Sequence, residues 1–196
     1  MFSKTTIIAL LTSLALTSAA PAEEISARQA PAEIAPTTVI GHALADAWDN
    51  YCSSPTSYGY LARNVWNGQE YGQTSLFTFT YPAASAGKQC WLDFYHAQPS
   101  WISNTNGIQV DVFTSWGENT CNAGDKSNKR DVNLGRLNVP ATGAATWAAK
   151  YSTSLTQKGP CKAAGTVERL ELVAVGDNTG LSYPQGPGAG LRILYA

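Results

Sequence analysis

The sequence has little charge and little of the chemistry that enzymes most often use. Charged residues are 14% of the 196-residue chain, and 13 basic residues nearly balance 14 acidic ones. No basic stripe is therefore present to bind nucleic acid. Only two histidines, His42 and His96, are available as general bases, and the motifs G-x-S-x-G and H-E-x-x-H and phosphate-cradling glycine loops are missing. We expect a protein that is not an enzyme and that holds no cofactor or metal.

Long hydrophobic runs are also missing, apart from one near the N-terminus. In residues 1–20, Lys4 precedes an apolar run of about ten residues and then small residues, which is the pattern of a secretory signal peptide. That run is too short to span a bilayer core of roughly 30 Å, and the C-terminal "GLRILYA" lacks a lipid-anchor signal. We expect a secreted protein, extracellular or in the cell wall, with no membrane anchor. Residues 21–40, rich in Pro, Ala and Glu, are expected to form a flexible or processed leader.

Cysteine is scarce but even in number. The four residues are Cys52, Cys90, Cys121 and Cys161, and in a secreted chain they predict two disulfides. Three pairings are possible from sequence alone. We favour Cys52 with Cys90 and Cys121 with Cys161, because the second bridge would tie together two long polar loops. No close cysteine pair or Cys/His cluster favours a zinc site instead.

Helix-length periodic segments are absent, whereas runs of alternating apolar and polar residues separated by turn residues are frequent. We predict strands at Tyr58–Trp66, Thr74–Tyr81, Gln89–His96, Ile108–Ser115, Val132–Val139, Ala144–Tyr151, Val167–Val175 and Gly190–Tyr195. Without helices between the strands, a parallel α/β sheet is not expected. We therefore predict one all-β domain over residues 41–196, an antiparallel, jelly-roll-like β-sandwich of about eight strands.

One aromatic-rich string carries a family resemblance. The string "SLFTFTYPAASAGKQCWLDFY" resembles the C-terminal domain of the fungal But-two family, named after a binding protein of the ubiquitin-like conjugation pathway. The segments "PCKAAGTVERLELVAVG" and "GPGAGLRILYA" are also similar, so the resemblance covers roughly residues 58–196. It implies a secreted fungal β-sandwich protein without an assigned reaction. The intracellular partner that the family name suggests is not carried over, because the chain begins with a signal peptide.

Two of the predicted strands have outer faces that could bind a ligand. Leu92 and Phe94 in one strand, and Ile108, Val110 and Val112 in the other, are expected to face the core. The opposite sides carry Trp91, Asp93 and Tyr95, and Gln109, Asp111 and Phe113. If the two strands share a sheet, one outer face combines rings with acid and amide groups, which suits a polysaccharide. The alternative is that a long loop covers these rings and makes them part of a second small core.

Acidic residues could also catalyse glycoside hydrolysis, because this reaction needs two carboxylates beside a cleft and their spacing in the sequence need not reveal them. The candidates are Asp93, Asp111, Glu118, Glu168 and Glu171, although we expect Glu168 and Glu171 at solvated positions. The leading hypothesis is a secreted, non-catalytic fungal binding or structural protein, with cell-wall polysaccharide or an extracellular protein as partner. The alternatives are a secreted effector-like protein that acts on a host protein, or a carbohydrate-active enzyme without a recognisable motif.

Overall fold

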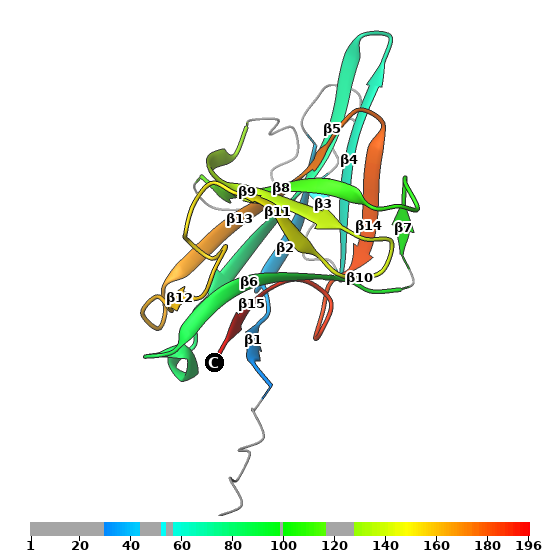
Figure 1. The fold of residues 1–196 in the computed structure, drawn as a ribbon. Coiled ribbons are helices and arrows are strands. Elements are labelled where there is room, and N and C mark those ends of the chain that lie inside the picture. The colour runs from blue at the N-terminus through cyan, green and yellow to red at the C-terminus, as the bar shows by residue number, and fades with distance from the viewer. Residues whose placement is uncertain (1–29, 44–51, 54–56, 99, 117–127) are drawn as a thin grey trace, which may run out of the picture.

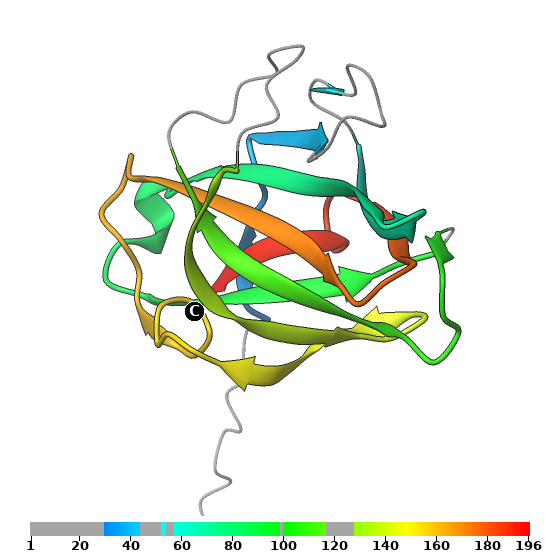
Figure 2. The same cartoon turned by 90° about the horizontal axis from the view of Figure 1, so that it is seen from above.

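Alternating apolar and polar residues form strands along most of the described chain. The structure is a computed structural model, and it describes residues 30–43, 52–53, 57–98, 100–116 and 128–196. The expected signal peptide, Cys121 and Glu118 lie outside these residues. The strands form two curled antiparallel sheets, as Figure 1 and Figure 2 show. One hydrophobic core lies between these sheets. The predicted all-β, antiparallel class is confirmed, whereas the jelly-roll order of strands stays a prediction.

The smaller sheet has five strands. Its order is β1-β15-β6-β10, and β12 also pairs with β6. The bounds are β1 Ala32–Ile34, β6 Gln89–His96, β10 Gly143–Ala144, β12 Gly159–Pro160 and β15 Gly190–Tyr195. The N-terminal β1 therefore pairs with the C-terminal β15, which holds the two ends of the described chain together.

The larger sheet has ten strands and contains most of the outer surface discussed below. Its main order is β11-β9-β8-β13-β5-β4-β14-β7, while β2 pairs with β5 and β3 pairs with β2. The bounds are β2 Thr38–Ala43, β3 Cys52–Ser53, β4 Tyr58–Trp66, β5 Gln69–Thr80, β7 Trp101–Ile102, β8 Ile108–Ser115, β9 Arg130–Val139, β11 Thr146–Lys150, β13 Val167–Val175 and β14 Thr179–Pro184.

The long strand β5 divides the larger sheet. Gln73 of β5 pairs with Ala43 of β2 on one edge and with Ala62 of β4 on the other. Further along β5, Thr78 pairs with β2 and with β13, so β4 and β13 follow one another along the same edge. Beyond Gln73, β4 leaves β5 and continues alongside β14, which in turn pairs with β7 (Figure 1). The result is a lateral unit of three strands, β4, β14 and β7.

The core lies between the two sheets and consists of the inward residues of the alternating strands. Leu92 and Phe94 of β6 are 4% and 1% exposed, which confirms their predicted core position. The predicted inward set of β8, Ile108, Val110 and Val112, is also buried. Phe94 packs edge to face against Tyr183 of β14 with ring centroids 5.0 Å apart, so an aromatic contact joins the two sheets.

Each of the eight predicted strands corresponds to an observed strand, with shifts at some ends. Two strands of six residues were missed, β2 and β14. β14 was missed because its glycine and closing proline are typical of turns. Residues 32–40, within the expected flexible or processed leader, contain β1 and the start of β2. Ile34 and Val39 there belong to the buried core, and such burial outweighs the disorder-prone composition around them.

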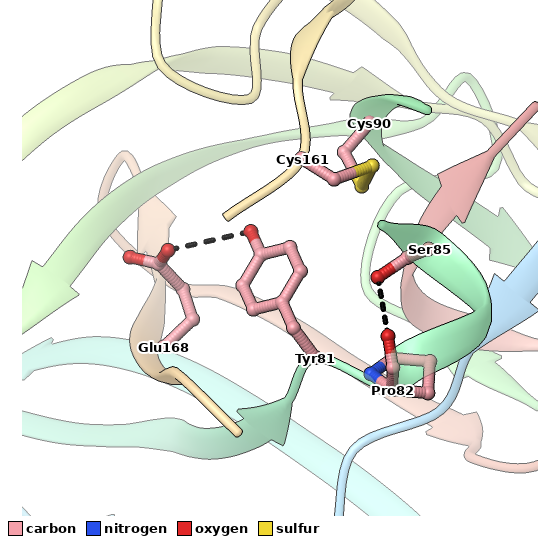
Figure 3. Close-up of a disulfide and its surroundings, with 6 residues drawn as sticks. All are labelled: Tyr81, Pro82, Ser85, Cys90, Cys161 and Glu168. Carbon is pink, nitrogen blue, oxygen red and sulfur yellow. Dashed lines mark hydrogen bonds between the residues drawn. A yellow bond between two sulfur atoms is a disulfide. The ribbon is translucent and has the colours of Figure 1, made fainter. Parts of the chain in front are cut away.

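A disulfide joins Cys90 of β6 to Cys161, which corrects the predicted sequential pairing. The bridge is possible because β12 pairs with β6 at Cys90 and brings the following residue alongside. Figure 3 shows it beside Tyr81, whose hydroxyl points at Glu168 at 3.5 Å. The bridge links positions 71 residues apart, so it fixes the segment before β13 onto the smaller sheet. Cys121 and the side chain of Cys52 lie outside what the structure describes.

Core packing of β6 can be tested with two neighbouring residues. Phe94→Ala should lower the free energy of unfolding by about 3–5 kcal/mol, through lost burial and the cavity left beside Tyr183. Tyr95→Ala is the matched control, because Tyr95 faces outward and is 38% exposed. Chemical denaturation of both variants measures the difference. Equal losses of stability would contradict the inward and outward assignment of this strand.

Candidate functional site

The three predicted ligand residues of β6 lie on the outer face of the smaller sheet. Asp93 is bound by Arg192 of β15, with the guanidinium Nη2 and Nε at 2.7 and 2.8 Å from Oδ2. Trp91 is half-buried, and the Lys158 ammonium lies 4.4 Å from its ring centroid. Tyr95 lies beside Gly190 and Ala144. The acid and the indole of this face therefore already have partners within the chain.

The other three predicted ligand residues lie on a different sheet. Gln109, Asp111 and Phe113 point outward from β8 in the larger sheet, so they do not continue the face of β6. Asp111 forms a two-pronged ion pair with Arg136, at 2.7 and 2.9 Å. Phe113 lies under the Arg130 guanidinium at 5.7 Å. Because the two strands do not share a sheet, the single mixed face of rings, acids and amides does not form.

The acids Glu168 and Glu171 are buried rather than solvated, which corrects the sequence-based expectation. Glu168 is 6% exposed and binds Lys162 and the Tyr81 hydroxyl. Glu171 is fully buried, and its Oε1 accepts from Arg130 Nε at 3.4 Å. Burial raises the pKa of Glu171, and the opposing attraction of Arg130 does not cancel this. Burial and the nearby Glu168 also raise the pKa of Tyr81, so that phenol stays protonated.

A group of exposed rings lies on the lateral unit of the larger sheet. Ser182 of β14 pairs with Tyr60 of β4 on one side and with Trp101 of β7 on the other, so both rings project from the same face. The two rings stack with centroids 6.3 Å apart and planes 22° from parallel. Tyr58 lies two residues before Tyr60, on the same face of β4. We call Tyr58, Tyr60 and Trp101 the aromatic platform.

The platform is outward-facing and partly open to solvent. Tyr58 is 48% exposed and Trp101 is 50% exposed. Their neighbours along the strands, Leu61 and Ile102, belong to or pack against the core, so the alternation points the rings the opposite way. Large rings exposed as a group are unusual on a monomeric protein and mark an interaction site more often than scattered single residues do.

The backbone holds these rings in place. The buried Ser75 hydroxyl donates to the Tyr60 carbonyl at 3.0 Å, at the point where β4 leaves β5. The Trp101 amide donates to Ser182 Oγ at 3.0 Å. The Trp101 ring lies directly over Gly180, where an added Cβ would come within 2.6 Å of it. A glycine is therefore needed at this position for the ring to rest on β14, and the platform is preformed.

The strand Tyr58–Trp66 was predicted from its alternation, whereas the platform was not. The alternation "YGY" at its start was a usable signal, because it puts two tyrosines on one face. Trp101 carried no comparable signal, since it lies two residues after a proline and between two predicted strands. Its contact with Tyr60 depends on β14, the strand that the turn-like composition concealed.

No protein-family model matches the chain, and no curated protein matches it either. The resemblance to the But-two C-terminal domain thus stays a prediction. Within the described ranges, no group of three or more His, Cys, Asp and Glu side chains is placed to hold a metal ion. The same ranges contain no helix of the length and hydrophobicity needed to cross a membrane.

The buried Glu171 predicts a pH dependence of stability. Because its pKa is higher in the folded than in the unfolded protein, protonation of Glu171 favours folding. This contribution is fully present below the unfolded pKa, about 4.3, and is lost as the pH rises through the folded pKa. Glu171→Gln should therefore raise the free energy of unfolding at neutral pH and reduce its fall between acidic and neutral pH.

Urea denaturation across that pH range measures the effect. Asp177→Asn is the control, because the Asp177 side chain is 63% exposed and its removal should leave the pH profile nearly unchanged. A contradicting result would be a lower free energy of unfolding for Glu171→Gln than for the wild type at neutral pH, with the same dependence of that free energy on pH. It would show that the ion pair with Arg130 outweighs the cost of burial.

Proposed function

We propose that this protein is a secreted, non-catalytic binding protein of the cell surface or extracellular space, and that it holds glycan on the aromatic platform. The observation that carries this proposal is the stacked pair of a half-buried Tyr60 and a half-exposed Trp101, set on a three-stranded unit. A preformed face of this kind costs little conformational entropy when a ligand binds.

Sugars fit the chemistry of this face. Aromatic rings offer a flat apolar surface together with a polar edge, so they can cover the C–H face of a pyranose while hydroxyl groups stay hydrogen-bonded. Tyr58, Tyr60 and Trp101 each carry a polar group on the ring, and Ser182 lies between two of them. An exposed platform of this size suits a polymer at the surface better than a small molecule that must be enclosed.

The ion pairs of the described acids support a non-catalytic role. Asp93, Asp111, Glu168 and Glu171 each have a cationic partner within the chain. A glycosidase needs two carboxylates that face each other across the sugar, one to protonate the leaving group and one to activate water or attack. None of these four acids lies in the strands β4, β14 and β7 that form the platform.

Secretion accounts for the disulfide and leads to an expectation for the remaining cysteines. Oxidising compartments favour disulfides, and Cys90 is bonded to Cys161. We expect a second disulfide between Cys52 and Cys121, the two cysteines that remain. Alkylation without reductant followed by peptide mass spectrometry should find no free thiol and two cross-linked peptides. Alkylated Cys52 and Cys121 would contradict this pairing.

Glycan binding by the platform can be tested with one substitution. Trp101→Ala should weaken retention on insoluble β-glucan, mannan or chitin by roughly tenfold or more, because it removes the most exposed ring of the platform. The free energy of unfolding should change by less than about 1 kcal/mol, since the ring is half exposed. Sedimentation with each polymer and thermal unfolding of the same preparations provide the two measurements.

Trp66→Ala is the matched control. Trp66 is an even more exposed ring, at 68%, but it lies at the far end of β4, beside the turn to β5. Its loss should leave retention unchanged. If the two variants are retained equally well, the platform is not the binding surface. Release of reducing sugar by the wild-type protein would favour the carbohydrate-active enzyme instead.

A further inference from the structure

Three of the stretches that contain no Asp, Glu, Lys or Arg lie near the platform. They are residues 94–110, 137–149 and 178–191, in a chain where charged residues are 14% overall. The platform residue Trp101 lies in the first stretch, and Gly180 and Ser182, which support it, lie in the third.

The three stretches meet on one side of the molecule. β10 in the second stretch pairs with the end of β6 in the first, at Tyr95 and His96. Gln98 Nε2 donates to the Ala141 carbonyl at 3.1 Å, which adds a side-chain link between these two stretches. β7 in the first stretch pairs with β14 in the third. Both Figure 1 and Figure 2 place β7 and the turn after β9 on this side.

Five of the six charged residues that border the stretches form ion pairs, and Lys150 is the sixth. Asp93 and Arg192 form one pair, Asp111 and Arg136 a second, and Asp177 and Arg63 a third. Their fields are therefore largely cancelled near the platform. A charged ligand bound here would lose water without gaining an opposite charge, and this is strongly unfavourable.

A groove of about 360 Å³ lies on the same side, and its lining exposes more apolar than polar surface. Asn106, Gln109, Asn138 and Thr146 supply its polar side chains, over Ile108 and Pro140. Gln109 Nε2 donates to Asn138 Oδ1 at 3.1 Å, which holds the two amides in register. That bond leaves the Gln109 carbonyl and the Asn138 amino group without another partner in the described part of the chain. Such a pair offers an acceptor and a donor side by side, which matches a sugar hydroxyl.

The groove lies within reach of the platform. Asn106 is five residues after Trp101, so their Cα atoms are at most about 18 Å apart. The actual separation is shorter, because the Gly107 amide bonds back to the Asn104 carbonyl at 2.9 Å and folds the connection. A glycan of several rings can therefore contact both places at once.

We infer that the platform and the groove form one extended site for a neutral polysaccharide, and that the groove binds the sugar units beyond those stacked on the rings. This inference rests on the proposed function and specifies its substrate class. Affinity comes from stacking on rings and hydrogen bonds to amides, so it does not depend on ionic strength, in contrast to binding between charges.

Two measurements test this on the full secreted protein. The first is sedimentation with neutral β-glucan, mannan and chitin, and with the charged polymers chitosan and polygalacturonate, in low salt and in 1 M NaCl. We expect retention on at least one neutral polymer, changing less than twofold with salt, and no retention on either charged polymer. Retention that falls severalfold in 1 M NaCl, or that favours a charged polymer, overturns this inference. The proposed function still stands in that case if Trp101→Ala abolishes the retention.

The second measurement is calorimetric titration with short and long oligosaccharides of the polymer that is retained. The double variant Gln109→Ala/Asn138→Ala should bind a long oligosaccharide about tenfold more weakly, as expected for the loss of two hydrogen-bonding groups. Its affinity for a disaccharide, which fills the platform alone, should be unchanged. Gln157→Ala, an exposed amide outside the three stretches, is the control.

The outcomes separate the two proposals. No retention of the wild-type protein on any polymer overturns both the proposed function and this inference. Salt-independent retention that is lost in Trp101→Ala supports the platform. If the double variant and Gln157→Ala then bind long oligosaccharides with equal affinity, the groove is not part of the site and only the platform remains. A denatured double variant is recognised by thermal unfolding, and the single variants Gln109→Ala and Asn138→Ala then replace it, each with an expected loss of severalfold.

Discussion

Everything on the surface of this protein follows from the alternation of its strands around one core. Leu61 and Ile102 face inward, and this alone places Tyr60 and Trp101 outward. The same constraint turns Asp93 towards Arg192 across the smaller sheet. Because a shift of one residue would reverse every side chain, burial of the core also fixes the register of the outer face. The aromatic platform is thus as well specified as the core beneath it.

The sequence predicted this alternation well where it was uninterrupted, and less well where glycine and proline occur. The inward residues of β6 and β8 were predicted correctly because they alternate over a full strand. β14 was hidden, because Gly180 and Pro184 resemble turn residues; Gly180 is there to make room for the Trp101 ring. Which strands share a sheet depends on contacts between distant residues, so the separation of β6 from β8 and the bridge from Cys90 to Cys161 were not predictable from local patterns.

Charge is distributed unevenly over the fold. The acids that sequence reasoning considered as catalytic candidates and that the structure describes are held in ion pairs, and two of them are buried. The side of the molecule that carries the platform instead has amides, hydroxyls and rings. Paired charges stabilise the sheets and keep the surface soluble, but they do not present a free carboxylate or ammonium to a ligand. We therefore propose recognition by stacking and neutral hydrogen bonds as the property that unites the site.

The central claim is that a neutral glycan stacks on Trp101. Its most direct test is a ¹⁵N NMR titration of the indole N–H signals with a neutral β-glucan hexasaccharide, because the protein has only six tryptophans and each gives its own signal. The Trp101 indole signal should shift as the hexasaccharide is added and reach a plateau. The signals of the exposed Trp66 and of Trp91, which Lys158 covers, should stay in place. An unchanged Trp101 signal, with shifts at Trp66 or Trp91 instead, would contradict this claim.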